Sequence, residues 1–524
     1  MDKQAYWKRF QKYLYTDDKI GFYLDVSRMY FHEDIFANMG EQLDQAFCAM
    51  DGLEEGAKVN VDEQRMAGHY WLRAAKLAPE KEITEAIDRE IAAVKEFSLK
   101  ILQGKILSCG KSAFRNLLLI GVGGSALGPQ LITDALLDKK KSLQPFFIDN
   151  TDPDGIDRII SNIGGELKDT LVIVVSKSGR TVETCNGLQE IRQIFSAEGI
   201  DFSANAVMIS TAGSELDKLA RSEGWLKRFY IWDWVGGRTS VFSAVGLLPA
   251  ALAGVDIDLF LAGARDMDES TRVKTARNNP SALLALMWYQ ATSGCGSKNM
   301  VIIPYKDQLQ YIPRYMQQLI MESLGKKHSL QQKTVHQGIN VYGNKGSTDQ
   351  HAYVQQLVMG LDNNFVIFIE VLSDWRQDMR IVKKEMGSGD YLRAFMLGTR
   401  EALTRNKRGS ITISLRKLDA YSLGALIAVF ERAVGFYAFM VGVNAYDQPG
   451  VEQGKKSADM IIDMLAETKT YLKAHPKVWS TLEEIALAVN RPQEIENLYK
   501  ILEYAVYDGK HGIKKSKKGY IYDM

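Results

Sequence analysis

The sequence contains few cysteines and histidines, and neither residue type forms a known ligand pattern. Among 524 residues there are 4 cysteines and 7 histidines. The cysteines (Cys48, Cys109, Cys185 and Cys295) form no Cys-x-x-Cys pair and no disulfide framework, which is typical of a reducing compartment. No His-Glu-x-x-His or mixed Cys/His spacing occurs. We therefore expect neither a metal site nor a bound cofactor.

Long apolar runs and an excess of charge are also absent. No uncharged apolar run reaches the roughly 18 residues of a membrane span, and the N-terminus lacks the apolar stretch of a signal peptide. The longest such segment, residues 240–255, is predicted to be a buried helix. Lys+Arg 65 against Asp+Glu 64 gives a net charge of +1, so no overall field attracts nucleic acid or an anionic membrane. We expect a cytoplasmic protein that meets anionic ligands at a local site.

Short apolar runs that alternate with helical segments predict an α/β fold. Runs of this kind, rich in β-forming residues, indicate parallel sheets covered on both faces. Their grouping predicts two doubly wound αβα sandwich domains. The runs are 117–122, 145–150, 171–176, 206–210 and 229–232 in the first group, and 299–304, 365–372 and 410–415 in the second.

The same pattern divides the chain into four segments. Residues 1–110 are predicted to be a helical segment packing on the core. Residues 111–275 form the first sandwich domain, with the phosphate site, and residues 276–470 form the second. Residues 471–524 form a small helical appendage that resembles a winged helix.

Two loops in the first domain are candidates for binding an anion. Gly121-Val122-Gly123-Gly124-Ser125 follows a predicted strand, where glycines expose backbone N–H groups at a helix N-terminus. Its third position is Ala126 rather than glycine, and no Gly-Lys-Ser/Thr follows, so the dinucleotide and nucleotide motifs are absent. A tight turn without a ligand explains this loop equally well.

The second loop is the stronger signal. Ser176-Lys177-Ser178-Gly179-Arg180-Thr181 places hydroxyls and cations at the expected carboxyl end of a parallel strand, where open α/β sheets bind ligands. Such a loop suits one phosphate monoester. The competing structural explanation is a Ser/Thr-rich helix cap with solvated cations.

Three further residues have candidate chemical roles. Arg238 follows two glycines and could stabilise an oxyanion, and Glu322 lies four residues after Gln318 on a predicted helix, among apolar neighbours, where it could act as a base. His351 lies in the first turn of a predicted helix that is capped by Ser347 or Thr348. Each also has a plain structural explanation: a surface arginine, a helix-end ion pair and a structural histidine.

The C-terminal segment has helix-turn-helix spacing and a basic end, so a nucleic-acid module is the rival interpretation. The would-be recognition helix carries Glu494, Glu496 and Glu503, whose charge has the wrong sign to face phosphates. Nucleic acid is therefore not the expected partner.

Taken together and in chain order, these motifs resemble the glucose-6-phosphate isomerase family. The resemblance extends from about residue 60 to about residue 470. It rests on residues 121–125, 176–178, 236–238, 321–326, 350–351 and 450–455, with an upstream segment at 60–73.

The resemblance implies sugar-isomerase (SIS) domains and a homodimer with composite active sites. It implies interconversion of glucose 6-phosphate and fructose 6-phosphate through a cis-enediol, without a metal ion. Glu322 would move the proton between C2 and C1, and Arg238 would stabilise the enediolate. His351 from the neighbouring subunit and Lys455 would open the ring. Phosphate and substrate contacts would come from Gly124, Ser125, Ser176, Lys177, Ser178, Thr181, Gln318 and Gln448.

Two alternatives stay open at this level. One is a sugar-phosphate-binding regulator with SIS domains and a C-terminal nucleic-acid module, and the other is an added epimerase activity toward mannose 6-phosphate. A regulator needs a phosphate site but no base. The joint presence of Glu322, His351 and Lys455 therefore favours the isomerase.

Overall fold

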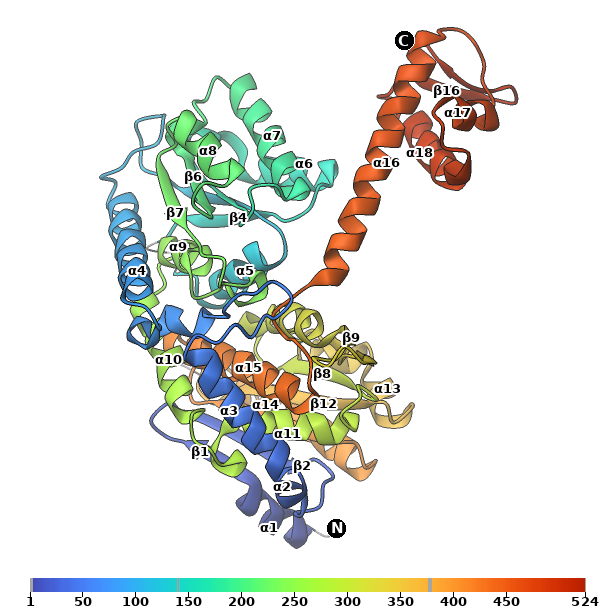
Figure 1. Cartoon of the computed structure of the whole chain (residues 1–524). Helices are drawn as coiled ribbons and strands as arrows, with labels where there is room; N and C mark the ends of the chain where they lie inside the picture. Colours follow the sequence, from blue (N-terminus) through green and yellow to red (C-terminus); the bar gives the residue numbers. More distant parts are fainter. Residues whose placement is uncertain (1–2, 139, 141, 376–378, 524) are drawn as a thin grey trace. The chain divides into compact units, whose positions relative to one another are not determined.

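The computed structural model describes residues 3–138, 140, 142–375 and 379–523. The chain forms two compact units, Met1–Asp447 and Gln448–Met524. The first unit holds two large β-sheets with helices around them (Figure 1). The predicted α/β fold with parallel sheets is confirmed.

The first sheet contains five parallel strands in the order β4-β3-β5-β6-β7. All five sequence-predicted runs of the first group form strands. The strands are β3 (Asn116–Ile120), β4 (Gln144–Ile148), β5 (Thr170–Val175), β6 (Ala206–Ser210) and β7 (Lys227–Tyr230). The helices that connect them are α5 (Leu127–Leu136), α6 (Pro153–Ile163), α7 (Val182–Ala197) and α8 (Glu215–Ser222).

Both faces of this sheet are buried, which explains its continuous apolar strands. Successive residues of a strand point to opposite faces. Leu117 and Leu119 belong to the large core of the unit, whereas Leu118 and Ile120 belong to a separate core on the other face. The strand order reverses between β3 and β5. The loops that follow these two strands therefore lie at the edge where open α/β sheets bind ligands.

The second sheet is mixed, with the order β1-β2-β15-β12-β8-β11. Its parallel part contains the three predicted runs and a short extra strand. Two antiparallel strands extend it at one edge. The strands are β8 (Asn299–Pro304), β11 (Val341–Tyr342), β12 (Asn364–Val371), β15 (Ser410–Leu415), β2 (Phe22–Arg28) and β1 (Leu14–Asp17).

The prediction that residues 1–110 are helical is wrong for the β1–β2 hairpin. Phe22, Leu24 and Val26 are fully buried, and β2 supplies hydrogen-bond partners to β15, which would otherwise be an exposed sheet edge. The local sequence does not reveal this pairing, because β15 lies near the other end of the unit. The helices of the segment are α1 (Lys3–Tyr13), α2 (Ile35–Asn38), α3 (Gly40–Glu54) and α4 (Lys81–Leu102).

The remaining helices surround the second sheet and join it to the first. The longest of them, α15, is long and apolar enough to cross a membrane, but 89% of its most apolar stretch is buried inside the fold, where it packs against α10, α11 and α3. The predicted buried helix within residues 240–255 is α9. These helices are α9 (Ala244–Leu252), α10 (Ile257–Ser270), α11 (Pro280–Thr292), α12 (Ile312–Met316), α13 (Val354–Met359), α14 (Ser388–Arg405) and α15 (Ala420–Val441).

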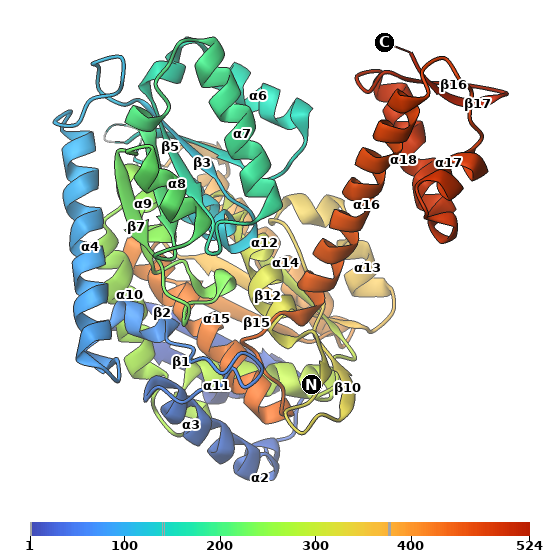
Figure 2. The same cartoon turned by 45° about the horizontal axis from the view of Figure 1, so that its top comes forward.

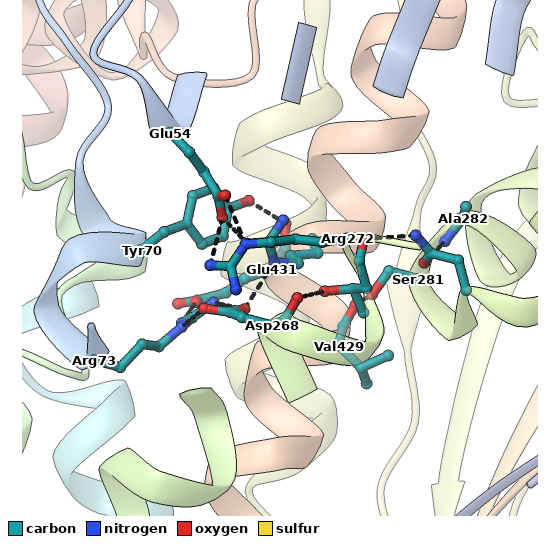
Figure 3. Close-up of polar contacts among 12 residues, drawn as sticks. Glu54, Tyr70, Arg73, Asp268, Arg272, Ser281, Ala282, Val429 and Glu431 are labelled. Carbon is teal, nitrogen blue, oxygen red and sulfur yellow. Dashed lines mark hydrogen bonds and ion pairs between the residues drawn. The ribbon is translucent and has the colours of Figure 1, made fainter. Parts of the chain in front are cut away.

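A buried ionic network ties the N-terminal segment to α10 and α15 (Figure 3). Arg73 donates to both carboxylate oxygens of Asp268, at 2.6 and 2.8 Å, and pairs with Glu431. Arg432 donates to Asp268 at 2.7 Å and pairs with Glu54. Burial raises the pKa of Glu431 to about 7, although the nearby Arg73 guanidinium opposes the shift. Each charge is paired, as its burial requires.

The second unit has its own apolar core, built from Met464, Leu472, Leu498 and Leu502 among others. A single antiparallel bridge joins Ser480 to Tyr520 of the β16–β17 hairpin. Figure 2 shows the hairpin and two short helices beside the end of α16. The predicted boundary at 470/471 falls inside α16. The elements are α16 (Pro449–Ala474), α17 (Leu482–Ala488), α18 (Ile495–Asp508), β16 (Ile513–Ser516) and β17 (Gly519–Tyr522).

Candidate active site

The hydroxyl-rich loop follows β5 and is held by its own side chains. Ser176 Oγ lies 3.0 Å from Thr181 Oγ1 and accepts a hydrogen bond from the N–H of Gly179 at 3.1 Å. Gly179 has φ +70°, and a Cβ there would lie 2.5 Å from the backbone N of Leu216. Only glycine fits this turn. The loop is thus a compact curl at the carboxyl edge of the sheet.

The glycine loop after β3 packs against the loop that carries Arg238. A Cβ on Gly124 would lie 2.0 Å from the carbonyl oxygen of Gly237. The Ser240 hydroxyl donates to the carbonyl oxygen of Gly124 at 3.3 Å. A Cβ on Gly123 would lie 3.0 Å from the side-chain nitrogen of Gln318. The glycines therefore permit a close approach between segments that are distant in sequence.

Lys177 connects the hydroxyl-rich loop to the same region. Its Nζ donates to the carbonyl oxygens of Asp233 and Val235, each at 2.8 Å. Burial of the ammonium lowers the pKa of Lys177 to about 8, and the nearby Arg65 charge adds to this effect. An ammonium has three N–H donors, and these two bonds leave one for a ligand. Lys177 therefore links the hydroxyl-rich loop to the segment before Arg238, and it is also a candidate phosphate contact.

Arg238 and Glu322 form the central pair of the site. Arg238 Nη1 lies 3.4 Å from Glu322 Oε1, and their side chains are 4% and 18% exposed. The guanidinium is held by Ser323 Oγ at 2.8 Å and by the carbonyl oxygens of Ala445 and Asp447, at 2.6 and 2.8 Å. Burial lowers the pKa of Arg238, whereas Glu322 opposes the shift. The arginine is a fixed cation in a dry environment.

The carboxylate of Glu322 is only partly satisfied. Its Oε2 is buried and accepts no hydrogen bond from the residues that the structure describes. Glu322 lies at the end of a π-helical segment, Gln317–Glu322, that continues α12. Wide turns of this kind often occur at functional sites. A buried carboxylate oxygen without a partner is well placed to accept a proton from a bound molecule.

A cavity of about 300 Å³ opens between the glycine loop and the π-helical segment. Gln318 lines it, and its Oε1 is buried without a hydrogen-bond partner among the described residues. The cavity residues are Val122, Gly123, Ala126, Leu127, Asp149, Arg314, Gln317 and Gln318.

The remaining predicted residues are not brought to this pair within the first unit. His351 is exposed at the end of a short 3-10 helix, Thr348–His351, whose N-cap Ser347 makes no side-chain capping bond. Its neighbour Gln350 points inward, with Nε2 3.0 Å from the carbonyl oxygen of Phe395. Gln448 and Lys455 belong to the second unit, and the side chain of Lys455 lies outside the described residues. Ser125 lies in the glycine loop after β3, and Ser178 lies in the hydroxyl-rich loop after β5.

Sequence reasoning missed two polar pairs beside the site. Lys326 Nζ lies 2.5 Å from Asp447 Oδ1, and burial lowers the pKa of Lys326 while raising that of Asp447. Arg314 lies 3.7 Å from Asp149, and both line the cavity. Arg314 comes four residues before Gln318, so its helical spacing was an available signal. The pairing of Lys326 with Asp447 had no local signal.

Comparisons with known proteins agree with the motif resemblance. Residues 25–387 and 361–477 match the family described as phosphoglucose isomerase. The glucose-6-phosphate isomerase of Citrifermentans bemidjiense is 51% identical, over 100% of this chain and 99% of that protein. That of Desulfitobacterium hafniense strain Y51 is 50% identical, over 97% of this chain and 95% of that protein. A crystal structure of a glucose-6-phosphate isomerase from Chlamydia trachomatis has a TM-score of 0.79 at 26% identity, covering 88% of this chain and 91% of that chain.

Proposed function

The chain belongs to the phosphoglucose isomerase family, and we propose on this basis that its site interconverts glucose 6-phosphate and fructose 6-phosphate. The observation that carries the proposal is the Arg238–Glu322 pair, with 3.4 Å between guanidinium nitrogen and carboxylate oxygen. An aldose–ketose isomerisation needs a base beside two adjacent carbons and a cation beside the oxygen that becomes negative. The pair supplies both groups.

In the proposed step, the unpartnered carboxylate of Glu322 removes the proton from C2 of the open-chain aldose. The electron pair moves toward the C1 carbonyl, whose oxygen becomes negative and takes up a proton to give a cis-enediol. Return of that proton from Glu322 to C1, with loss of the C2 hydroxyl proton that balances the one taken up at the C1 oxygen, then produces the ketose. Arg238 stabilises the negative oxygen, because it is already oriented by Ser323 and two carbonyls and needs no reorganisation during the step.

The phosphate is assigned to the two loops at the reversal of strand order. Gly124, Ser125, Ser176, Ser178 and Thr181 offer hydroxyl or N–H donors at this edge, and Lys177 adds a charge. Gln318 and Gln448 are the proposed polar contacts to the sugar. Binding energy from the phosphate, remote from C1 and C2, orients the reacting carbons.

Ring opening is assigned to His351 and Lys455. The exposure of His351 on its own unit supports a role in a site shared with a second copy of the chain. We therefore propose a homodimer with composite active sites, working in the cytoplasm. Size measurement in solution, and restoration of activity on mixing inactive His351→Ala and Glu322→Gln proteins, test the shared site.

The central experiment replaces Glu322 with Gln, which keeps the shape and removes the base. Turnover of fructose 6-phosphate should fall by about 10² to 10⁴, while calorimetric binding of fructose 6-phosphate survives. Glu198→Gln is the matched control, because it makes the same change at an exposed residue on the far end of α7. With glucose 6-phosphate deuterated at C2, the wild type moves label to C1 and to solvent, and Glu322→Gln does neither. Normal label transfer by the variant would remove Glu322 from the proposed role.

The alternative of a nucleic-acid-binding regulator has weaker support. In the second unit, Lys515 pairs with Glu503 at 2.6 Å and Lys500 with Glu496 at 2.5 Å. These ion pairs lower the positive charge available to a phosphate backbone. A gel shift by the full chain that weakens with added salt would favour the regulator.

A further inference from the structure

A second cavity, of about 710 Å³, lies between α1, β2 and α14, and shares no residue with the site above. Its size is typical of sites for small molecules. Its lining is strongly basic, with Lys3, Arg28, Arg400, Arg405 and Lys407 against a single acid, Glu401. Glu401 is already paired with Arg405 at 3.1 Å. The cavity thus has an excess of positive charge that its own residues do not balance.

Two of the arginines have buried N–H groups without partners. Nε and Nη1 of Arg28, and Nε of Arg400, are buried and donate no hydrogen bond to any residue that the structure describes. The other end of Arg400 is fixed, because Nη2 donates to Asp25 at 2.7 Å. Buried guanidinium N–H groups without acceptors are costly. An anion with several acceptor oxygens would satisfy them and neutralise the excess charge.

The cavity also offers a flat aromatic surface. Trp7 stacks on Phe10 with ring centroids 5.7 Å apart, and it is 56% exposed. Tyr6 lies under the guanidinium of Arg28, with 4.2 Å from Cζ to the ring centroid. All three rings line the cavity. An exposed tryptophan beside a cluster of cations suits a ligand that combines a planar ring with an anionic tail.

We propose that this cavity is a binding site for a nucleoside polyphosphate. The phosphates lie against the guanidinium groups of Arg28 and Arg400, which line the cavity, with Lys3, Arg405 and Lys407 adding charge, and the base stacks on Trp7. A free phosphate or sugar phosphate would use the arginines and leave Trp7 uncovered. The ring and the charges together therefore favour a nucleotide.

The test uses the full chain and ATP as the probe, with binding measured by calorimetry. ATP should bind, and binding should weaken as salt rises, because the contacts are ionic. Arg28→Met, which keeps an unbranched side chain but removes the charge, should weaken binding at least about tenfold. Trp7→Ala should weaken it by roughly 5- to 100-fold. Arg405→Gln, at an exposed position, gives a second variant that leaves the fold undisturbed and should weaken binding at least about threefold.

Lys8→Ala is the matched control, since it removes a neighbouring exposed cation of α1 that does not line the cavity. It should leave ATP affinity unchanged. Isomerase activity without ATP reports correct folding of each variant. Absence of ATP binding at millimolar concentration would overturn the proposal, as would equal affinity for inorganic triphosphate or displacement of ATP by glucose 6-phosphate. If a second copy of the chain fills the cavity instead, ATP does not bind at millimolar concentration.

Discussion

Replacing Gly124 with alanine tests whether close contact between two loops sets the geometry of the proposed catalytic pair, Arg238 and Glu322. The new Cβ would lie 2.0 Å from the carbonyl oxygen of Gly237 and 2.2 Å from its carbonyl carbon. Real Cβ contacts stay above 3.0 Å, so the two backbones must separate by about 1 Å. Arg238 follows Gly237 directly, and its guanidinium lies 3.4 Å from Glu322. The substitution therefore displaces the proposed oxyanion stabiliser from the proposed base.

A misplacement of about 1 Å costs on the order of 10²-fold in rate, and overpacking of this kind costs about 1–3 kcal/mol of stability. We expect kcat/KM of Gly124→Ala to fall by about 10²-fold, with a small loss in melting temperature. The assay couples conversion of fructose 6-phosphate to oxidation of glucose 6-phosphate by an added dehydrogenase. Differential scanning fluorimetry supplies the melting temperature.

Gly237→Ala is an unusually close control, because a Cβ at that neighbouring position meets no atom within 4 Å. It should keep nearly full activity. The reasoning would be refuted if Gly124→Ala kept kcat/KM within about threefold of the wild type while remaining folded. It would also fail if Gly237→Ala lost as much activity as Gly124→Ala.

Three further predictions follow from buried charges and from the proposed chemistry. Burial raises the pKa of Glu90 to about 7, and its carboxyl accepts a hydrogen bond from the N–H of Tyr230 at 2.6 Å. Because the folded pKa is above the unfolded one, the stability that Glu90 contributes is complete below about pH 4.5 and is lost as pH rises through about 7. Glu90→Gln should therefore exceed the wild type in stability by about 1–3 kcal/mol at pH 8 and match it near pH 4.5, measured by urea unfolding. Asp268→Asn removes the carboxylate charge that pairs with both Arg73 and Arg432. It should lower the free energy of unfolding by about 3–5 kcal/mol in the same measurement. Isomerase activity should be unchanged by EDTA, because the proposed step uses only side chains.

Each of these predictions has a result that would contradict it. A constant stability difference between Glu90→Gln and the wild type from pH 4.5 to 8 would mean that the carboxyl titrates normally. For Asp268, the control is Glu496→Gln, which breaks the exposed pair with Lys500 and should leave unfolding unchanged; a similar loss in both variants would contradict the reasoning. Inactivation by EDTA that added Zn²⁺ or Mg²⁺ reverses would show that the reaction needs a metal.

Much of the fold could be predicted from sequence because its signals are local. Strands β3 and β5 are buried on both faces and therefore appear as continuous apolar runs. The hairpin of β1 and β2 could not be predicted in this way. Its formation depends on a partner, β15, that lies far away in sequence.

For the candidate site too, the residue types could be predicted from the sequence, but their arrangement in space could not. The residue types around Ser176, Arg238 and Glu322 are visible in the sequence, since phosphate binding and acid–base chemistry require particular side chains. Their spatial relation is not visible. Only the folded chain shows Gly124 against Gly237, Lys177 against the carbonyl oxygens before the Arg238 loop, and the buried unpartnered oxygen of Glu322.

The sequence by itself determined most of the helices and strands, the β1–β2 hairpin excepted, and which chemical groups are available, because backbone preference and hydrophobic periodicity act over a few residues. The tertiary structure decided which of those groups meet. Packing of two sheets brings together loops that are far apart along the chain, and close packing allows a fixed separation only where glycine leaves room. Burial then shifts the pKa values of the ionisable groups, because the removal of water makes the charge of a guanidinium or carboxylate depend on the groups packed beside it.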